Sequence, residues 1–584
     1  MMIIPSHLLA TALCATLSLA ATEYPSNWNV VFTNATAIPA SYPFGREDFY
    51  LAKNSNPTPP SGRPLPCDIL KKRDVPIKLR DNTVIYADVF IPANQTGRFP
   101  TLVNLSPYGK NTPSAMVPPG VNLVWVSGYE KFEGADPAAY TCRGYAVVNP
   151  DNRGSYYSKG RIHFWGSSVD GQDGYDVVEW AARQSWSTGK VATIGASWLA
   201  ISQWFVAALN PPHLAAIVPW DGFSDFYRDN VMWGGIPDTG MTGSVAGSLV
   251  GGSTVERPDL MTESHPYMDS YWEDKRALLE QITVPAYVVA DNIMPLHTKG
   301  AIEGYRGISS KDKWLRIDDT QEWNDMYNPL WQQDSLQFLD YFLKGSKNGW
   351  ELTPRVRAAV TDAGGSNRLA HFNNWPAENT EYVKLYLDAS RSTLSTARPS
   401  SREAKATYHG TAGNTTFVTT FSEDTQLIGY FSAHLFVEAT GAGIDDMDIF
   451  LTVQKLSADG TILENLPACT ADLQSGCEQA AGSTPGTQAR LRVSLRALDR
   501  KKSTSYFPVQ SFKNPQKLRA AEIVAIDVAF VPNAYFFHAG QKLRLIVSAQ
   551  SSSGDPGLNT QNASYTIHTG GKFQSYVQIP VVPH

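Results

Sequence analysis

Short apolar runs alternate with amphipathic segments between residues 66 and 350, and this alternation leaves the chain few possible folds. The runs "RFPTLVNLSPYG", "GYAVVNPDNRG" and "KVATIG" have the length and apolar character of buried strands. "DGQDGYDVVEWAARQ" and "WLAISQWFVAALN" carry apolar residues at helical spacing. Strands that alternate with helices form a parallel sheet with helices on both faces. We therefore predict an α/β domain built from residues 66–220 and 283–350.

Three other segments depart from this pattern. Residues 22–65 are rich in Pro, Asn and Ser, which indicates an extended N-terminal arm. Residues 221–282 contain Gly- and Met-rich stretches and a charged helical segment, which indicates an inserted helical cap. After about Pro354, short alternating segments such as "VRAAVTD", "YVKLYLD" and "KLRLIVSA" predict an all-β sandwich over residues 354–584.

The apolar run Leu8–Ala21 is too short for a typical membrane-spanning helix and ends in small residues. It predicts a signal peptide over residues 1–21, and hence a protein that is secreted or lies in the secretory-pathway lumen; the alternative is an uncleaved anchor. N-glycosylation sequons agree with that route. We expect modification at Asn34, Asn94, Asn414 and Asn562. A fifth sequon, at Asn104, lies in a segment that we expect to be buried.

Removal of the signal peptide also removes Cys14 and leaves four cysteines, an even number that suits an oxidising compartment. Cys469 and Cys477 lie in one Gly/Ala/Ser-rich loop, and we expect them to pair. Cys67 and Cys142 then form the second disulfide. The alternative for Cys142, which opens an apolar strand, is a buried free thiol.

The charge pattern excludes some classes of partner. The chain has 49 Lys and Arg against 55 Asp and Glu and contains no basic run, so we expect no nucleic-acid partner. We expect no membrane association. We also expect no metal or other cofactor, because the chain lacks a Walker loop, a CxxC pair and an HExxH motif. The expected partner is a small-molecule substrate, and the sequence leaves the oligomeric state open.

The predicted strand "KVATIG" runs directly into Gly195-Ala196-Ser197-Trp198 and then into a helix. A serine on a sharp strand-to-helix turn is the nucleophile elbow of an α/β-hydrolase, and the Trp198 amide that follows it can bind an oxyanion. Leu199 replaces the glycine that usually ends this motif. The alternative is a serine that only caps the helix.

The order of these segments resembles the family of cocaine esterase, α-amino-acid ester hydrolase and Xaa-Pro dipeptidyl-peptidase. The resemblance rests on "SPYGK", "GYAVVNPDNRGSYYSKG", "DGYDVVEWAARQSWSTGKVATIGASW", "DGFSDFYRDN", "FLDYFLKG" and "GQKLRLIVS". It implies an α/β-hydrolase domain with a helical cap insertion, followed by an all-β jelly-roll sandwich. It also implies hydrolysis of esters or amides by a Ser/Asp/His triad, with Tyr108 as an oxyanion-hole residue beside the Trp198 amide.

The chain departs from the family at two triad positions. Alignment places Met294 at the position of the acid and Glu322 or its neighbours at that of the base, and no histidine lies between His297 and His371. We therefore hypothesise that acid and base have exchanged loops. Ser197 would attack, His297 would accept and return its proton, and Glu322 would orient the imidazole.

Alternatives to this triad stay open. Asp291 or Asp319 can replace Glu322 as the acid, or His297 can simply cap a helix while Glu322 forms a surface ion pair. Asp221, Asp225 and Asp229 recur every four residues, so they share one face if their segment is helical, where they can bind a substrate amine or form a structural hinge.

We favour a secreted serine hydrolase that acts on a small-molecule ester or amide through an acyl-enzyme on Ser197. One alternative is a biosynthetic enzyme on the same fold that transfers an acyl group, cyclises or eliminates. Another is a catalytically inactive binding protein. The fold alone does not decide among these functions.

Overall fold

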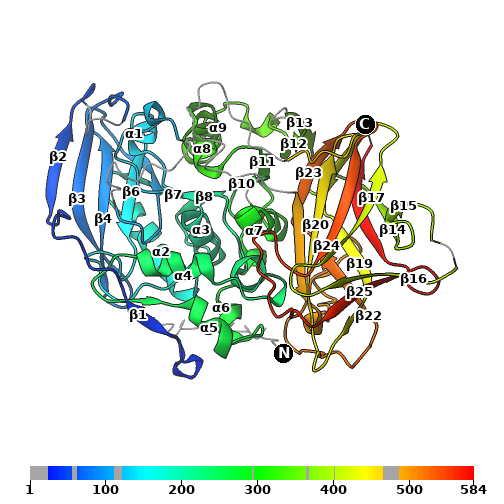
Figure 1. Ribbon diagram of the computed structural model, residues 1–584. Coiled ribbons are helices and arrows are strands. Elements are labelled where there is room, and N and C mark those ends of the chain that lie inside the picture. Colours follow the sequence, from blue (N-terminus) through cyan, green and yellow to red (C-terminus); the bar gives the residue numbers. More distant parts are fainter. Residues whose placement is uncertain are drawn as a thin grey trace, which may run out of the picture.

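The computed structural model describes residues 24–55, 62–110, 121–292, 295–362, 367–399, 401–464 and 486–583. The predicted signal peptide, Met294, Cys469 and Cys477 lie outside these ranges. Figure 1 shows a helix-covered sheet on one side of the molecule and a β-sandwich on the other. Within the described residues, no helix has both the length and the apolar character needed to cross a membrane.

The first part of the molecule is one long twisted sheet. Its strands follow the order β2–β3–β4–β6–β5–β7–β8–β10–β11–β12–β13, and all pairs from β6 to β12 are parallel. Their bounds are Glu47–Leu51 (β2), Ile69–Lys78 (β3), Val84–Pro92 (β4), Ala146–Asp151 (β6), Phe99–Val103 (β5), Ser187–Ala196 (β7), Leu214–Trp220 (β8), Ala286–Asp291 (β10), Lys313–Asp318 (β11), Val356–Thr361 (β12) and Asn367–Phe372 (β13).

Helices cover both faces of this sheet, as the alternation of segments predicted (Figure 1). One face packs against α2, α3 and α7, and the other against α1, α8 and α9. Because the parallel strands are covered on both faces, their residues are almost continuously buried. The bounds are Pro137–Thr141 (α1), Ser168–Ala182 (α2), Trp198–Ala208 (α3), Pro295–Gly307 (α7), Glu322–Tyr327 (α8) and Pro329–Leu339 (α9).

Residues 221–282 carry short elements and add no strand to the long sheet: α4 (Gly240–Ser248), β9 (Thr254–Glu256), α5 (Pro258–Ser264) and α6 (Ser270–Asp274). The described N-terminal residues reach this segment, because β1 (Phe32–Asn34) pairs antiparallel with β9. Tyr24 also donates a hydrogen bond to the buried Glu256, which forms an ion pair with Lys275. The N-terminal residues therefore pack against the segment between β8 and β10.

One strand differs from our expectation. We placed residues 356–361 at the start of the sandwich, but β12 pairs in parallel with β11 and extends the hydrolase sheet. All six residues of β12 are buried, as a strand covered on both faces requires. The end of β12 also pairs with β23, at Thr361 and Tyr535, so this strand links the two parts of the molecule.

The C-terminal part is an antiparallel sandwich. One layer contains the rows β16–β25–β19–β22 and β14–β26–β18–β23, joined through β19 and β26, and the other contains β17–β24–β20–β21. The bounds are Glu381–Asp388 (β14), Thr393–Ser395 (β15), Ala404–His409 (β16), Asn414–Thr420 (β17), Thr425–Gly429 (β18), Ser432–Thr440 (β19), Asp448–Leu456 (β20), Thr487–Arg492 (β21), Val524–Ala529 (β22), Asn533–Phe537 (β23), Lys542–Ser548 (β24), Ser564–Thr569 (β25) and Tyr576–Val582 (β26).

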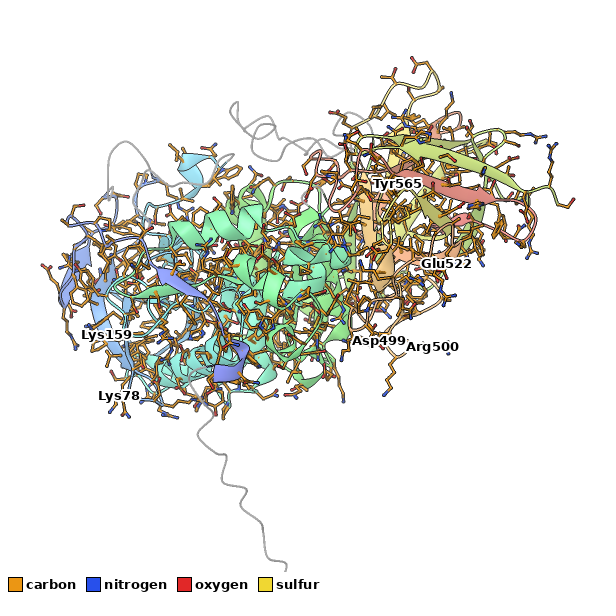
Figure 2. All side chains as sticks on the ribbon, turned by 60° about the horizontal axis from the view of Figure 1, so that its bottom comes forward. Lys78, Lys159, Asp499, Arg500, Glu522 and Tyr565 are labelled. Carbon is orange, nitrogen blue, oxygen red and sulfur yellow. A yellow bond between two sulfur atoms is a disulfide. The ribbon has the colours of Figure 1, made fainter. Side chains whose placement is uncertain are left out.

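Charged side chains extend from both ends of the molecule, among them Lys78 and Lys159 on the hydrolase part and Arg500 on the sandwich (Figure 2). The four asparagines predicted to carry glycans, Asn34, Asn94, Asn414 and Asn562, are exposed. Asn104 is fully buried and donates a hydrogen bond to Asn149, so its sequon is inaccessible in the folded chain.

Cys67 and Cys142 form a disulfide, which closes a loop of 75 residues. Cys67 lies just before β3 and Cys142 ends α1, so the bond ties the antiparallel edge of the sheet to a covering helix. Cross-linking a loop of this length is expected to stabilise the fold by about 4 kcal/mol, mainly through the unfolded chain.

We therefore predict that the double variant Cys67→Ser, Cys142→Ser unfolds at a temperature lower by roughly 3 °C. Calorimetry of the oxidised wild type and the variant measures this difference. Reduced wild type is the control and should match the variant, whereas equal melting temperatures of oxidised wild type and variant would refute a stabilising role.

Candidate active site

Ser197 lies at a strained turn between β7 and α3. Its backbone has φ of 52° and ψ of −116°, in a region that side-chain-bearing residues rarely occupy. The Ser197 amide donates to the carbonyl oxygens of Trp220 (3.0 Å) and Asp221 (3.1 Å) at the end of the neighbouring strand β8. These contacts fix the serine at the carboxyl edge of the parallel sheet, which is the geometry of a nucleophile elbow.

Small residues allow this turn to close. Gly195 has φ of +136°, and a Cβ there would lie 2.5 Å from the Leu199 Cβ and 3.0 Å from the Glu133 carbonyl oxygen. Leu199, which stands where the motif usually has a glycine, packs its side chain over Gly195. On the other side of the turn, Gly222 leaves room for Ala200, whose Cβ would lie 2.5 Å from an added Cβ.

Two groups can stabilise an oxyanion beside Ser197. Trp198 is the first residue of α3, so its amide has no acceptor within the helix. The Tyr108 ring packs edge-on against the Trp198 ring at 5.5 Å. Burial, followed by the charge of Glu133, raises the pKa of the Tyr108 phenol well above its ordinary value, while Trp165 acts in the opposite direction. Tyr108 therefore keeps its proton and can donate a hydrogen bond.

The structure brings His297 and Glu322 together from neighbouring strands. His297 lies in the first turn of α7, after β10, and Glu322 begins α8, after β11. Both are buried, and His297 Nε2 lies 3.9 Å from Glu322 Oε2, too far for a hydrogen bond. His297 also stacks on Phe223, with ring centroids 5.6 Å apart.

His297 differs from an engaged catalytic base. Within the described residues, neither of its ring nitrogens has a hydrogen-bond partner, and no hydrogen bond joins it to Ser197. Burial lowers the pKa of His297 to about 3, so the imidazole is neutral. Burial, followed by the charge of Glu133, raises the pKa of Glu322 well above its ordinary value.

The alternative acids lie at the same sheet edge. Asp291 is the last residue of β10 and is buried; its amide donates to Asp221 Oδ1 at 2.5 Å. Asp319 follows β11 and is partly exposed. Burial, followed by the charge of Asp291, raises the pKa of Asp221 well above its ordinary value. The carboxyl edge of the sheet thus gathers several carboxyl groups, and the charge of Arg316 partly counters the rise in the pKa of Asp221.

A residue that the sequence analysis missed, Glu133, is hydrogen-bonded to the nucleophile turn. Its carbonyl oxygen accepts a hydrogen bond from the Ala196 amide at 2.9 Å, and its Oε1 accepts one from Trp323 Nε1 at 3.0 Å. Within the described residues, its Oε2 has no hydrogen bond. Burial raises the pKa of Glu133 to about 8, and contacts with Trp323 and the Ser197 hydroxyl partly counter this rise. No sequence motif marks Glu133. Its position depends on the conformation of its loop, in which the Glu133 backbone has φ of +62°.

The raised pKa of Glu133 predicts a pH-dependent cost in stability. The folded chain keeps this proton up to about pH 8, whereas the unfolded chain releases it near 4.5. Stability therefore falls as pH rises through this window. Glu133→Gln cannot titrate and should melt roughly 4 °C above wild type at pH 9, with a smaller difference at pH 5. Thermal unfolding at both pH values tests this, with exposed Glu351→Gln as control; a difference independent of pH would refute it.

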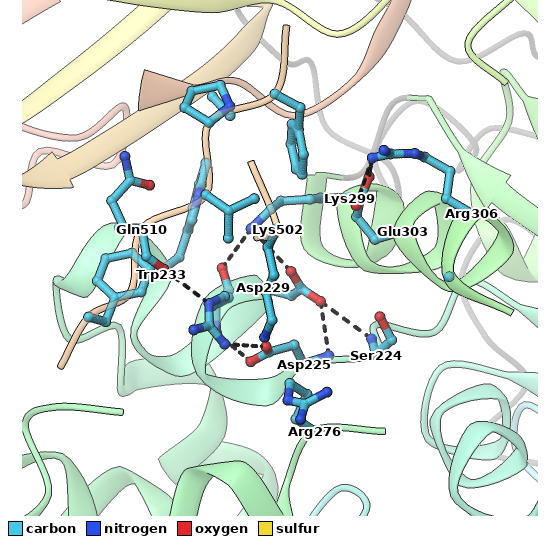
Figure 3. Close-up of a pocket in the computed structure, with 18 of the residues that line it drawn as sticks. Ser224, Asp225, Asp229, Trp233, Arg276, Lys299, Glu303, Arg306, Lys502 and Gln510 are labelled. Carbon is cyan, nitrogen blue, oxygen red and sulfur yellow. Dashed lines mark hydrogen bonds and ion pairs between the residues drawn. The ribbon is translucent and has the colours of Figure 1, made fainter. Parts of the chain in front are cut away.

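Asp221, Asp225 and Asp229 do not share a helix face. The helical turn covers only Tyr227–Val231, and Asp221 directly follows β8. Asp225 forms an ion pair with Arg228 at 2.7 Å, and Asp229 one with Lys299 at 3.1 Å. Both aspartates line a cavity of about 340 Å³, bordered by α7 and by sandwich residues including Lys502 and Gln510 (Figure 3). Their existing partners favour a structural role over capture of an amine.

Comparisons with known proteins agree with this architecture. Residues 81–260 match the X-Pro dipeptidyl-peptidase (S15 family), and residues 348–578 match the X-Pro dipeptidyl-peptidase C-terminal non-catalytic domain. The crystal structure of a CocE/NonD family hydrolase from Staphylococcus aureus is similar, with a TM-score of 0.80 and 32% sequence identity over 88% of this chain and 94% of that chain.

More distant relatives extend the comparison. A candidate serine esterase of Mycobacterium bovis is 22% identical over 87% of this chain and 94% of that protein. The cocaine esterase of a Rhodococcus species is 23% identical over 54% of this chain and 62% of that protein. The chain therefore belongs to the α/β-hydrolase family that includes the S15 X-Pro dipeptidyl-peptidases and the CocE/NonD hydrolases, a family of serine esterases and peptidases.

Proposed function

We propose that this protein is a serine esterase that cleaves a small-molecule ester through an acyl-enzyme on Ser197. The observation that carries the proposal is the backbone of Ser197, which is held in a strained conformation between β7 and α3 beside the Trp198 amide and Tyr108. A helix-capping serine needs no such strain, and Ser197 makes no side-chain cap hydrogen bond. The turn instead presents a hydroxyl next to two potential oxyanion donors.

Esters are the favoured substrates because the alcohol that leaves an ester depends less on proton transfer than the amine that leaves an amide. Our alignment places Glu322 at the base position of the usual triad, and His297 Nε2 lies 3.9 Å from Glu322 Oε2. Oxyanion stabilisation by Tyr108 and Trp198 would supply a large share of the rate. Proton transfer must come from His297, with Glu322, or from a carboxyl group beside Ser197.

We further propose that the protein acts in an oxidising, secretory environment. The Cys67–Cys142 disulfide and the exposure of all four favoured sequon asparagines support this proposal. Expression in a secreting eukaryotic host, followed by mass analysis with and without glycosidase treatment, tests it. Glycans at the exposed asparagines are expected, and an unmodified secreted protein would count against the glycosylation sites.

A fluorophosphonate probe tests the serine esterase directly. Intact mass should show one adduct on wild type and none on Ser197→Ala. The absence of an adduct on well-folded wild type would contradict the acyl-enzyme proposal and favour non-covalent chemistry or binding.

A further inference from the structure

We propose that Glu133 is the general base that takes the proton of the Ser197 hydroxyl, an inference that rests on the proposed function. Glu133 comes from the loop before α1, and the relatives' triad as aligned to this chain assigns it no role. Glu133 is 3% exposed, so its carboxyl group is shielded from solvent.

Two attachments hold Glu133 against the nucleophile turn. The backbone attachment is the hydrogen bond from the Ala196 amide, one residue before Ser197. The side-chain attachment is the hydrogen bond from Trp323 Nε1 to Oε1, which leaves Oε2 without a partner among the described residues. A buried carboxyl oxygen without a hydrogen-bond donor costs free energy, and such an atom is a candidate for a catalytic role. The neighbouring Ser197 hydroxyl is the donor that this oxygen can engage during the reaction.

The surrounding loop is fixed by interactions of its own. The Lys131 amino group is fully buried and donates to the carbonyl oxygens of Ser106 (2.7 Å) and Pro150. The Tyr327 hydroxyl donates to the carbonyl oxygen of Gly134 at 3.0 Å. These bonds on either side of Glu133 anchor it to β6 and α8. A preorganised base is what proton transfer from a serine requires.

His297 fits this task less well. Its ring nitrogens have no hydrogen-bond partner in the part of the chain that the structure describes, and Glu322 Oε2 lies 3.9 Å from its Nε2. A neutral imidazole with a pKa of about 3 is a weak base, whereas a carboxylate with a pKa of about 8 is a stronger one than an ordinary glutamate. The titratable groups that face Glu133 are Tyr108, from the loop after β5, and Glu322 and Tyr327, from α8.

The proposed step balances without a further reactant. The Ser197 Oγ forms a bond to the ester carbonyl carbon as its proton moves to the Glu133 carboxylate. The carbonyl electron pair moves to oxygen, where the Tyr108 hydroxyl and the Trp198 amide stabilise it. Collapse of this intermediate breaks the bond to the leaving alcohol, which takes the proton from Glu133. Water then attacks the acyl carbon while Glu133 takes its proton. Collapse of the second intermediate breaks the bond to Ser197 Oγ, which takes the proton from Glu133, and the carboxylic acid leaves.

The test compares acylation in four forms of the full-length protein. Stopped-flow bursts with p-nitrophenyl acetate and rates of fluorophosphonate labelling are measured for wild type, Glu133→Gln, His297→Gln and Glu130→Gln. Glu130 is the matched control because it lies in the same loop, is buried and has a pKa raised to about 7 by burial, but accepts its hydrogen bond from Gly128. We expect Glu133→Gln to slow acylation by about 10²- to 10³-fold, and the other two variants to slow it by less than about tenfold.

The pH profile separates catalysis from a structural role. With Glu133 as base, the acylation rate of wild type rises with pH and levels off above about 8, and Glu133→Asp keeps a profile with a shifted midpoint. With His297 as base, the rate would already be level above about pH 5. If Glu133→Gln fails to fold, wild type and Glu133→Asp decide the question through these profiles.

Two results would overturn the inference while leaving the esterase intact. One is loss of acylation in His297→Gln with near-normal rates in Glu133→Gln, and the other is a wild-type profile that is flat between pH 5 and 9. A wild type that neither forms a burst nor reacts with the probe would instead contradict the proposed function itself.

Discussion

Ser197→Ala is expected to lower ester turnover by about 10⁴-fold or more, because removal of a nucleophile ends the covalent route and leaves only binding and oxyanion stabilisation. The elbow geometry makes this prediction specific to one hydroxyl. Ser197 sits at the strained turn, with its amide bonded to the Trp220 and Asp221 carbonyl oxygens, so the side chain can change without displacing the backbone.

Steady-state hydrolysis of p-nitrophenyl acetate measures this effect. Ser202→Ala is the matched control, because Ser202 is also buried and lies on the same helix, α3. It should keep turnover within about threefold of wild type. Turnover by Ser197→Ala within tenfold of wild type would show that another group performs the chemistry.

The second large effect is expected for Tyr108→Phe, which should lower kcat by about 10²- to 10³-fold with little change in KM. The substitution removes one hydroxyl and keeps the ring that packs on Trp198 and Phe132. A donor that acts on the oxyanion stabilises the transition state more than the bound ester, so the loss belongs in kcat.

Tyr140→Phe controls for the loss of a buried phenol, since Tyr140 lies in α1 and packs in the core on the opposite face of the sheet from α3. It should leave kcat within a few-fold of wild type. A rise in KM without a fall in kcat for Tyr108→Phe would assign Tyr108 to substrate binding instead of the oxyanion hole.

Much of the fold and part of the site follow from local sequence. Ser197 could be placed because a strand, a turn and a helix are adjacent in the chain, and the backbone geometry follows from that order. The approach of His297 to Glu322 could be anticipated because their loops leave neighbouring parallel strands. Their 3.9 Å separation, which decides whether they interact, depends on packing of α7 against Phe223 and is not encoded locally.

Other features depend on long-range contacts. Glu133 joins the site only because the Ala196 amide and the Trp323 indole, from distant parts of the chain, hold its loop in place. The apolar pattern of β12 fits either a sandwich strand or a buried parallel strand, and only pairing with β11 decides. Asp225 and Asp229 recur at helical spacing, yet their ion pairs with Arg228 and Lys299 show a structural use.

Rapid-quench mass spectrometry tests the central claim most directly. The wild-type protein is mixed with p-nitrophenyl acetate, quenched within milliseconds, digested and analysed by peptide mass. The account predicts one acetyl group on the peptide that contains Ser197, formed at the rate of the burst and removed at the rate of turnover. Product formation without a covalent intermediate, or acetylation at another residue, would contradict it.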